Sequence, residues 1–363
     1  MNPFKAWLHR HLSDPQVVIL GAVLLAGLVL ILFFGRILAP VLASLVLAYL
    51  LEGLVERAEH VRLPRLAAVV LVFMVFLVAL FFLLFGLLPI LSRQVGQLVQ
   101  DLPTMVARAH QELLGLPERF PEVVTEEQVD QLMGALGEEL GSLGQAILSI
   151  SLEGVRSLIT VLIYIVLMPL LVFFFLKDKA KIKNWFFQFL PNDRALTTRV
   201  WRDVDLQIGN YIRGKVWEIL LVWVASYVTF AWLDLDFAML ISLLVGFSVL
   251  VPYIGATVIT LPIAIIGYFD FGFSAQLAWL LLAYGVIQLL DGNLLAPLLL
   301  SEVVNLHPVA VIVAVLFFGG IWGFWGVFFA IPLATLVQSV IKAWPRPEVA
   351  ALAAPEKEPA GSG

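Results

Sequence analysis

The first candidates for chemistry are three polar side chains at one end of a long apolar run. Gln288 lies within the apolar residues 275–290, and Asp291 and Asn293 follow in the motif DGNLLAP, which ends at Pro297. A polar or ionisable side chain at membrane depth costs roughly 2.5–3.5 kcal/mol on insertion scales and usually marks a pathway or a partner. The Asp291 carboxylate could bind a cation or carry a proton. The alternative is a capped helix end near the membrane interface, where Asp and Asn are favoured.

A second candidate is the sequence VLVPYIGATVITLP, residues 249–262, in which three helix-breaking residues interrupt an apolar segment. They are Pro252, Gly255 and Pro262, and Tyr253 adds a hydroxyl group beside the first of them. Broken helices expose backbone carbonyls and amides, which can bind ions or polar solutes without a charged side chain. The alternative is a packing kink, because Pro and Gly are more frequent in membrane helices than in soluble ones.

Other polar residues combine with turn signals. They are Arg213, in the motif YIRGK, then Asp234, Asp236, Glu302, Asn305 and His307. For the two aspartates, in LDLDF, a solvated loop is the favoured interpretation. His307 precedes Pro308, which suits the first turn of a helix, so a helix cap is predicted there. No HxxxH or HExxH spacing accompanies His307, so no metal site is predicted.

Four glycines in the sequence GGIWGFWG could bring helices together. They are Gly319, Gly320, Gly323 and Gly326. Small residues four apart allow two helices to approach closely, which predicts helix packing here. Pore lining is the alternative.

The composition indicates the solvent in which these residues lie. Hydrophobic residues make up 61% of the 363 positions and charged residues only 13%, whereas soluble domains are near half apolar and a quarter charged. The chain therefore predicts an integral membrane protein, with the lipid bilayer as its first partner. The net charge of −5 and the lack of a basic patch interleaved with aromatic residues argue against a nucleic-acid partner.

The sequence gives little support to an enzyme or a cofactor site. It contains no cysteine, which removes thiolate nucleophiles and iron–sulfur ligation. GxSxG and HExxH motifs are absent, and so is a GxxxxGK motif followed by Ser or Thr. The two carboxylates of an intramembrane aspartyl protease are not matched by Asp270, in YFDFG, or Asp291, in LLDGN. We therefore expect neither a catalytic residue nor a cofactor.

Apolar segments of about 20 residues predict membrane-spanning helices. The candidates are Val17–Phe34, Ile37–Leu51, Leu66–Ile90, Leu158–Leu176, Val216–Leu233, Phe237–Tyr268, Ala275–Leu290 and Val309–Ile341. The predicted fold is thus an all-α polytopic membrane protein with about eight transmembrane elements. Phe237–Tyr268 is too long for one straight span, so it either crosses as a bent helix or folds back as two short halves. Val309–Ile341 raises the same question.

The predicted organisation alternates membrane helices with polar segments. Residues 1–90 hold helices 1–3, 91–152 an extracytoplasmic amphipathic helical segment, 153–176 helix 4, 177–215 a basic cytoplasmic helical segment, 216–342 a C-terminal membrane core with broken helices, and 343–363 a disordered tail.

Basic residues predict the orientation of these helices, because short loops rich in Lys and Arg stay cytoplasmic. If the first four spans are as given, the N-terminus, the segment from Arg57 to Arg65 and the Lys177 segment all fall on the same side. We therefore expect both termini in the cytoplasm and the acidic segment 91–152 outside.

Five motifs, taken in order, resemble those of the autoinducer-2 exporter family of PerM-like permeases. They are YIRGK, LVPYIGATVITLP, DGNLLAP, NLHP and GGIWGFWGVFFAIPLA. The resemblance covers essentially the whole chain. It implies an eight-helix permease in the cytoplasmic (inner) membrane of a prokaryote, assembled as a homo-oligomer. Some members are linked to export of autoinducer-2, and others to exchange of sodium or lithium for protons.

Three hypotheses follow. The first is a secondary transporter or facilitator that exports a small polar metabolite, such as the hydroxyl-rich autoinducer-2, by hydrogen bonding at Pro252–Gly255, Tyr253, Gln288 and Asn293. The second is an antiporter of a monovalent cation and a proton, with Asp291 as the exchanging acid ahead of Asp234, Asp236 and Glu302. The third is a scaffold or receptor that binds a partner through the outer segment, residues 91–152.

Overall fold

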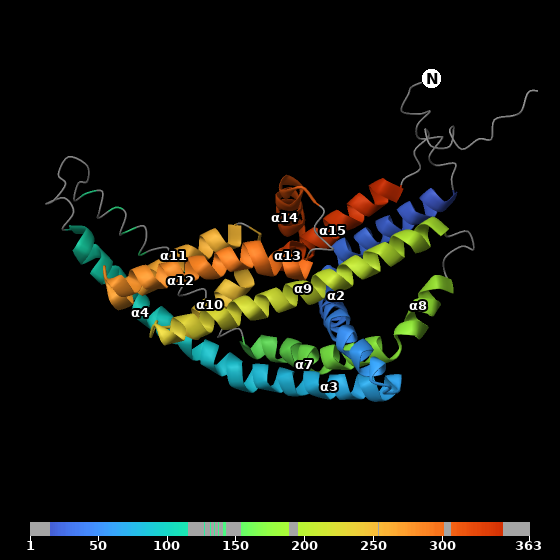
Figure 1. The fold of residues 1–363 in the computed structure, drawn as a ribbon, viewed down its shortest axis with the longest axis horizontal. Coiled ribbons are helices and arrows are strands. Elements are labelled where there is room, and N and C mark those ends of the chain that lie inside the picture. The colour runs from blue at the N-terminus through green and yellow to red at the C-terminus, as the bar shows by residue number, and fades with distance from the viewer. Residues whose placement is uncertain are drawn as a thin grey trace, which may run out of the picture. The chain divides into compact units, whose positions relative to one another are not determined.

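Every regular element that the structure describes is helical. The computed structural model describes residues 15–114, 154–188, 195–252, 254–300 and 306–343, with a few isolated residues between 127 and 142. The elements, shown in Figure 1, are α2 (Pro15–His60), α3 (Arg65–Phe82), η1 (Leu83–Leu87), α4 (Leu88–Leu114), α7 (Gly154–Lys177), α8 (Lys179–Gln188), α9 (Ala195–Trp232), α10 (Ala238–Ser248), α11 (Ile254–Phe271), α12 (Ala275–Leu290), η2 (Asp291–Leu295), α13 (Ala296–Leu300), α14 (Pro308–Trp322) and α15 (Phe324–Ala343).

The described helices are long and apolar enough to cross a membrane in five places. These are Ile37–His60, Arg65–Glu112, Asp205–Trp232, Ile254–Phe271 and Ala275–Leu300. Four shorter apolar helices accompany them in the described residues: Tyr164–Lys177, Ala238–Ser248, Pro308–Trp322 and Phe324–Val340. The predicted all-α polytopic membrane fold is confirmed.

The first two predicted spans are one helix. α2 runs for 46 residues through Gly35 and Arg36, where a reversal of the chain was expected. At 1.5 Å per residue it is about 69 Å long, more than twice the thickness of a hydrocarbon core. One glycine and one arginine do not stop a helix when apolar residues continue on both sides. The prediction of two separate spans, Val17–Phe34 and Ile37–Leu51, is therefore wrong.

The third predicted span continues without a break into the predicted outer segment. α3, the π-helical turn η1 and α4 follow one another from Arg65 to Leu114. Within α4, Leu91, Val95, Leu98 and Met105 are spaced at helical intervals and pack against buried residues of other helices. This apolar face holds α4 to the core although its remaining surface is polar.

The long segment from Phe237 to Tyr268 folds back on itself. It forms two helices, α10 and α11, which contact each other and are joined by a turn at residues 249–252. A side chain on Gly255 would collide with the backbone carbonyl of Ser248, so only glycine permits this close return. Of the two alternatives, a broken segment is therefore confirmed. α10 has 11 residues, too few to span a bilayer.

The last apolar segment is broken in the same way. α14 and α15 pack against each other and meet at Gly323, whose φ of 58° lies in the region that favours glycine. Gly326 contacts the backbone of Phe318, and a Cβ on Gly319 would lie 2.9 Å from Val327. Gly323 thus forms the turn, whereas Gly319 and Gly326 lie at the contact between the two helices. A side chain on Gly320 would meet open space.

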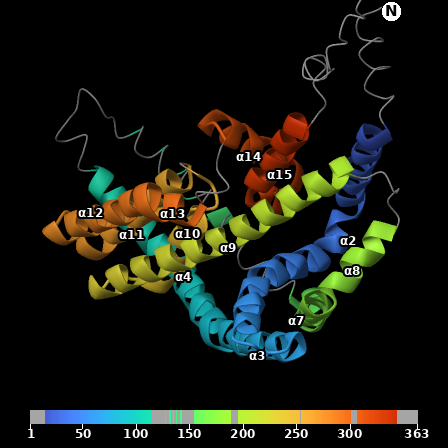
Figure 2. The same cartoon turned by 45° about the vertical axis from the view of Figure 1, so that its right-hand side comes forward.

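The chain divides into two compact units. The larger unit covers residues 36–182 and 212–301 and contains two hydrophobic clusters. One cluster joins α2, α3 and α7 around Val55, Val69 and Val172. The other joins α4 with α9–α12 around Val222 and Ile263, and Figure 2 shows α10, α11 and α12 lying together. The smaller unit contains the α14–α15 hairpin, and there Phe328 meets the ring of Tyr211 edge-on.

The close approach at Gly255 predicts a large cost for any side chain at that position. We expect Gly255→Ala to lower the unfolding temperature of the purified protein in detergent by several degrees, because overpacking costs roughly 1–3 kcal/mol. Gly285→Ala is the matched control, since a Cβ at Gly285 meets nothing within 4 Å. Equal unfolding temperatures for the two variants would contradict the packing of α10 on α11.

Candidate functional site

Three ionisable side chains lie buried together in the larger unit. Lys215 and Glu218 belong to α9, and Asp291 begins the π-helical turn η2. Lys215 Nζ lies 2.9 Å from Glu218 Oε2, and the Asp291 carboxylate is within electrostatic range of both residues. Asp291 is only 7% exposed. We call these three residues the buried charge cluster.

The position of the cluster follows from the spacing of residues along α9. Lys215, Glu218, Val222 and Ser226 recur every three or four residues, which places them on one face of the helix. All four are buried. At Gly214, α9 comes so close to α13 that an added Cβ would lie 2.5 Å from the carbonyl oxygen of Leu299. The polar face of α9 is therefore held against neighbouring helices rather than exposed to lipid.

Asp291 lies at a change of helical pitch, not at a helix end. α12 passes into the π-helical turn Asp291–Leu295 and then into α13. The interpretation of DGN as a capped helix terminus is therefore wrong. A π-turn inserts one extra residue per turn and often marks a functional site. Here it lies at the only acidic residue of the segment 275–300.

A line of polar side chains runs along α12 to the buried charge cluster. Tyr284, Gln288 and Asp291 are spaced by four and three residues and so share a face. The hydroxyl group of Tyr284 donates a 2.7 Å hydrogen bond to the carbonyl oxygen of Ala256, the residue after Gly255. The broken segment and the DGN motif, which lie far apart in the sequence, are thus connected through Tyr284. We call Tyr284, Gln288 and the buried charge cluster the polar line.

Several buried polar atoms on these helices have no hydrogen-bond partner within the part of the chain that the structure describes. Among them are Asp291 Oδ1, Gln288 Nε2 and Ser226 Oγ. An unsatisfied polar atom in a buried site costs free energy, and such atoms are commonly satisfied by water or by a ligand. With every group ionised, one lysine and two carboxylates give the cluster a net charge of −1.

Other residues predicted for this pathway are not among the buried polar groups that the structure describes. Asn293 is exposed, and its amide donates to the carbonyl oxygen of Leu289 at 2.8 Å. Pro297 is also exposed, whereas Pro252 and Pro262 are half-buried. Tyr253, Glu302 and Asn305 lie outside the described residues.

The secondary candidates have structural roles in the described chain. His307 is the N-cap of α14, where its Nδ1 accepts a hydrogen bond from Val309 N and Pro308 follows, so the predicted cap is confirmed. Arg213 packs its side chain against Gly53. Asp234 and Asp236 are exposed in the turn before α10, as expected of a solvated loop.

That turn forms one wall of an open pocket of about 760 Å³ in the larger unit. The opposite wall is α4, which contributes Gln94, Gln97 and Gln100. Gln94 also accepts a hydrogen bond from Leu240 N and so satisfies the first turn of α10. In the same turn, Asp236 N donates to Asp270. Of the residues that line this pocket, Gln94 thus holds α4 to α10, and Asp236 holds the turn to α11.

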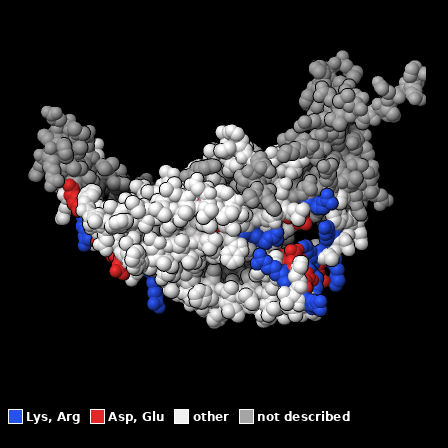
Figure 3. Space-filling view, in the orientation of Figure 1, with Lys and Arg blue, Asp and Glu red and all other residues white. Residues whose placement is uncertain are grey.

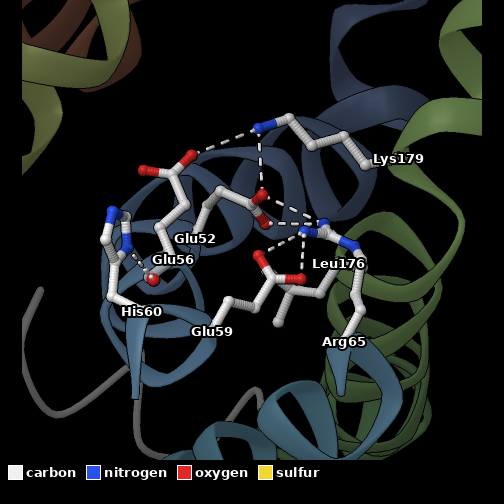
Figure 4. A network of polar contacts seen from close by, with 7 residues as sticks. All are labelled: Glu52, Glu56, Glu59, His60, Arg65, Leu176 and Lys179. Carbon is white, nitrogen blue, oxygen red and sulfur yellow. Dashed lines mark hydrogen bonds and ion pairs between the residues drawn. The ribbon is translucent and has the colours of Figure 1, made fainter. Parts of the chain in front are cut away.

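A second group of charges lies where α2, α3 and α7 meet. Arg65 donates to Glu52 at 3.0 Å, to Glu59 at 3.2 Å and to the carbonyl oxygen of Leu176 at 2.9 Å, as Figure 4 shows. Lys179 Nζ lies 3.0 Å from the buried Glu52. In Figure 3, charged side chains gather at this end of α3 and α7, while the surface of α10–α12 is largely uncharged. These contacts join the segment that ends at Arg65 to the start of the basic segment 177–215.

Three residues of the polar line were not among the predicted site residues. In the sequence, Lys215 belongs to the basic segment 177–215, and Glu218 and Tyr284 lie inside predicted apolar spans. The sequence does indicate a role for Lys215 and Glu218, because an opposite-charge pair three residues apart at the start of an apolar helix predicts a buried ion pair.

Apolar helices that cross a membrane and enclose unpaired polar atoms are the arrangement of a membrane transport protein. The comparison with known sequences agrees with this class. Residues 22–346 match the AI-2E family transporters, and the chain belongs to that family. The resemblance drawn from its five motifs is thereby confirmed.

Individual relatives cover most of the chain. PerM of Escherichia coli K12, a candidate permease, is 42% identical over 344 residues, which cover 95% of this chain and 98% of PerM. YueF of Bacillus subtilis, a candidate transport protein, is 25% identical, covering 85% of this chain and 84% of YueF. The AI-2 transport protein TqsA of E. coli K12 is 24% identical, covering 91% and 93%.

The buried ion pair predicts a strong asymmetry between single and double substitutions. We expect Lys215→Met to destabilise the protein by roughly 3–5 kcal/mol, because it leaves buried carboxylates without their cation. Lys215→Met combined with Glu218→Gln should recover most of that loss. Thermal unfolding in detergent measures both effects.

Lys181→Met is the matched control, because Lys181 pairs with Asp178 at the same sequence spacing and at 3.0 Å, but on the surface. An exposed pair of this kind contributes about 0–1 kcal/mol. Equal losses for Lys181→Met and Lys215→Met would show that the Lys215–Glu218 pair is not desolvated.

Proposed function

We propose that this chain is a secondary transporter that exports a small polar solute across the cytoplasmic membrane along the polar line. The observation that carries the proposal is the buried Asp291 carboxylate, whose Oδ1 has no hydrogen-bond partner in the described part of the chain. A polar group in a membrane interior is retained when it binds a substrate or an ion. We further propose that the protein works as a homo-oligomer in a prokaryotic inner membrane.

The available hydrogen-bonding groups favour an uncharged solute rich in hydroxyl groups. A hydroxyl group both donates and accepts, so it can donate to Asp291 Oδ1 and accept from Gln288 Nε2. Ser226 on α9 offers a further hydroxyl. The distant relative TqsA is an AI-2 transport protein, which supports a solute of the autoinducer-2 class.

The helix interruptions supply the mobility that such a path needs. The π-turn at Asp291 and the turn between α10 and α11 are both points where regular backbone hydrogen bonding is disturbed. Membrane transporters commonly bind their substrates at discontinuous helices of this kind, and these segments move as gates open. Tyr284 connects the two points, so a movement of one can be transmitted to the other.

A second candidate function, exchange of sodium or lithium for protons, is favoured by the net charge of the buried charge cluster. One unit of negative charge in a dry interior is neutralised when a proton or a monovalent cation occupies Asp291. Lys215 is already paired with Glu218, so it leaves Asp291 available for this exchange. In this case Asp291 alternates between its protonated and its cation-bound form.

One reconstitution experiment separates the two functions. Wild type, Gln288→Leu, Asp291→Asn and Asn293→Leu are each inserted into liposomes, and both autoinducer-2 flux and internal pH after a sodium pulse are followed. Asn293→Leu is the matched control, because this exposed amide lies outside the polar line.

For solute export we expect Gln288→Leu to slow flux by about tenfold, the loss of one buried hydrogen bond. Asp291→Asn should keep much of the flux, because its amide oxygen still accepts. For antiport, a sodium-dependent pH change should vanish in Asp291→Asn. If the wild type shows neither solute flux nor a pH change, both functions are refuted and the scaffold hypothesis remains.

A further inference from the structure

The short helix α8 begins where the chain leaves an apolar helix. Only Asp178 separates Lys177, the last residue of α7, from Lys179, the first residue of α8. α7 is apolar over the described side chains Tyr164–Lys177. At 1.5 Å per residue, the first two turns of α8 lie within about 10 Å of that apolar end, which is the depth of lipid headgroups.

α8 presents an apolar stripe between lysines. Ile182 and Trp185 are three residues apart, so they share one face, and they are 40% and 60% exposed. Successive residues are rotated by 100° around a helix, so Lys181 and Lys183 fall on opposite sides of Ile182. Apolar residues flanked by lysines are the pattern of a helix that lies in the membrane interface. Tryptophan is itself enriched at that depth.

The charge of this region is strongly positive. Lys177, Lys179, Lys181 and Lys183 occur within seven residues, against the single acidic residue Asp178. Lys181 is 82% exposed, although it pairs with Asp178. Lys177 and Lys183 lie over aromatic rings of the chain, which leaves their ammonium groups near the surface. Clusters of this kind bind acidic lipids at the membrane surface.

Lys179 has a different role from its neighbours. It pairs with Glu52 at 3.0 Å and with Glu56 at 3.8 Å, and Glu52 is also held by Arg65. The start of α8 is therefore fixed to α2 and α3, while Lys181, Ile182, Lys183 and Trp185 face outward. These ion pairs thus hold the first residue of α8 to α2.

We propose that α8 is an interfacial helix that inserts Ile182 and Trp185 into the bilayer surface and binds acidic phospholipid headgroups through Lys181 and Lys183. Acidic lipid is favoured over a soluble polyanion because the lysines flank exposed apolar side chains next to the apolar helix α7. This inference does not depend on which solute the protein transports.

Native mass spectrometry of the full chain tests the headgroup contact. Purified protein is mixed with equal amounts of phosphatidylglycerol and phosphatidylcholine, and the lipids retained are counted. We expect wild type to retain phosphatidylglycerol preferentially, and Lys181→Gln with Lys183→Gln to reduce that retention by about tenfold, because each basic residue near the surface adds to the attraction. The variant Lys181→Arg with Lys183→Arg, which keeps both positive charges, should still retain phosphatidylglycerol preferentially.

The control removes the same charge from α4 by Arg93→Gln with Arg108→Gln, both exposed. An equal loss in this control, or no preference for phosphatidylglycerol in wild type, would overturn the proposal. Loss of lipid in millimolar inorganic phosphate would also overturn it, because the site would then bind free anions.

A second measurement tests insertion of the apolar stripe. The chain has no cysteine, so Ile182→Cys can carry a single fluorescent label in the reconstituted protein. We expect quenching by lipids brominated near the headgroup and protection from iodide in water. Quenching by iodide alone would place α8 in solvent and overturn the insertion.

Discussion

The cost of holding charge inside a bilayer governs the arrangement of this chain. Among the side chains that the structure describes, two groups of buried ionisable residues are paired or brought together in the apolar helices. Lys215 and Glu218 form an ion pair on one face of α9, and Asp291 joins them from the π-turn. Glu52, buried near the end of α2, is bonded by Arg65 and Lys179. The second group is fully paired, whereas the first retains one carboxylate oxygen without a described partner. That difference separates a structural junction from a site available to a solute or an ion.

Backbone geometry also separates rigid structural contacts from the site around Asp291. Close helix contacts depend on Gly214, Gly255 and Gly326, where the neighbouring element lies against the backbone itself. These contacts fix α9, α11 and α15 in positions that larger side chains would forbid. The turn after α10 and the π-turn at Asp291 disturb helical hydrogen bonding beside the polar line. Rigid contacts and local interruptions thus lie next to one another, as a path through a helical membrane protein requires.

The sequence predicts the class of fold well, because composition and apolar run length respond directly to the bilayer. The breaks at residues 249–252 and Gly323 and the cap at His307 follow from proline and glycine chemistry. The continuity of α2 could not be predicted in this way, because Gly35 and Arg36 lower helix propensity without ending a helix. The burial of Lys215 and Glu218 is less evident, because Lys215 ends a basic segment and Glu218 stands alone inside an apolar span. Only packing places Tyr284 beside Ala256, 28 residues earlier in the chain.

The most direct test of the polar line is the access of water to it. Because the chain contains no cysteine, Gln288→Cys and Leu289→Cys each introduce a single thiol. Their reaction with a charged, water-soluble methanethiosulfonate reagent is followed in liposomes, since the reactive thiolate forms in water rather than in lipid. We predict modification at position 288 and none at 289, because Leu289 is 65% exposed on the apolar surface that this account places against lipid. Modification at 289 with none at 288 would contradict a solute path along this face of α12.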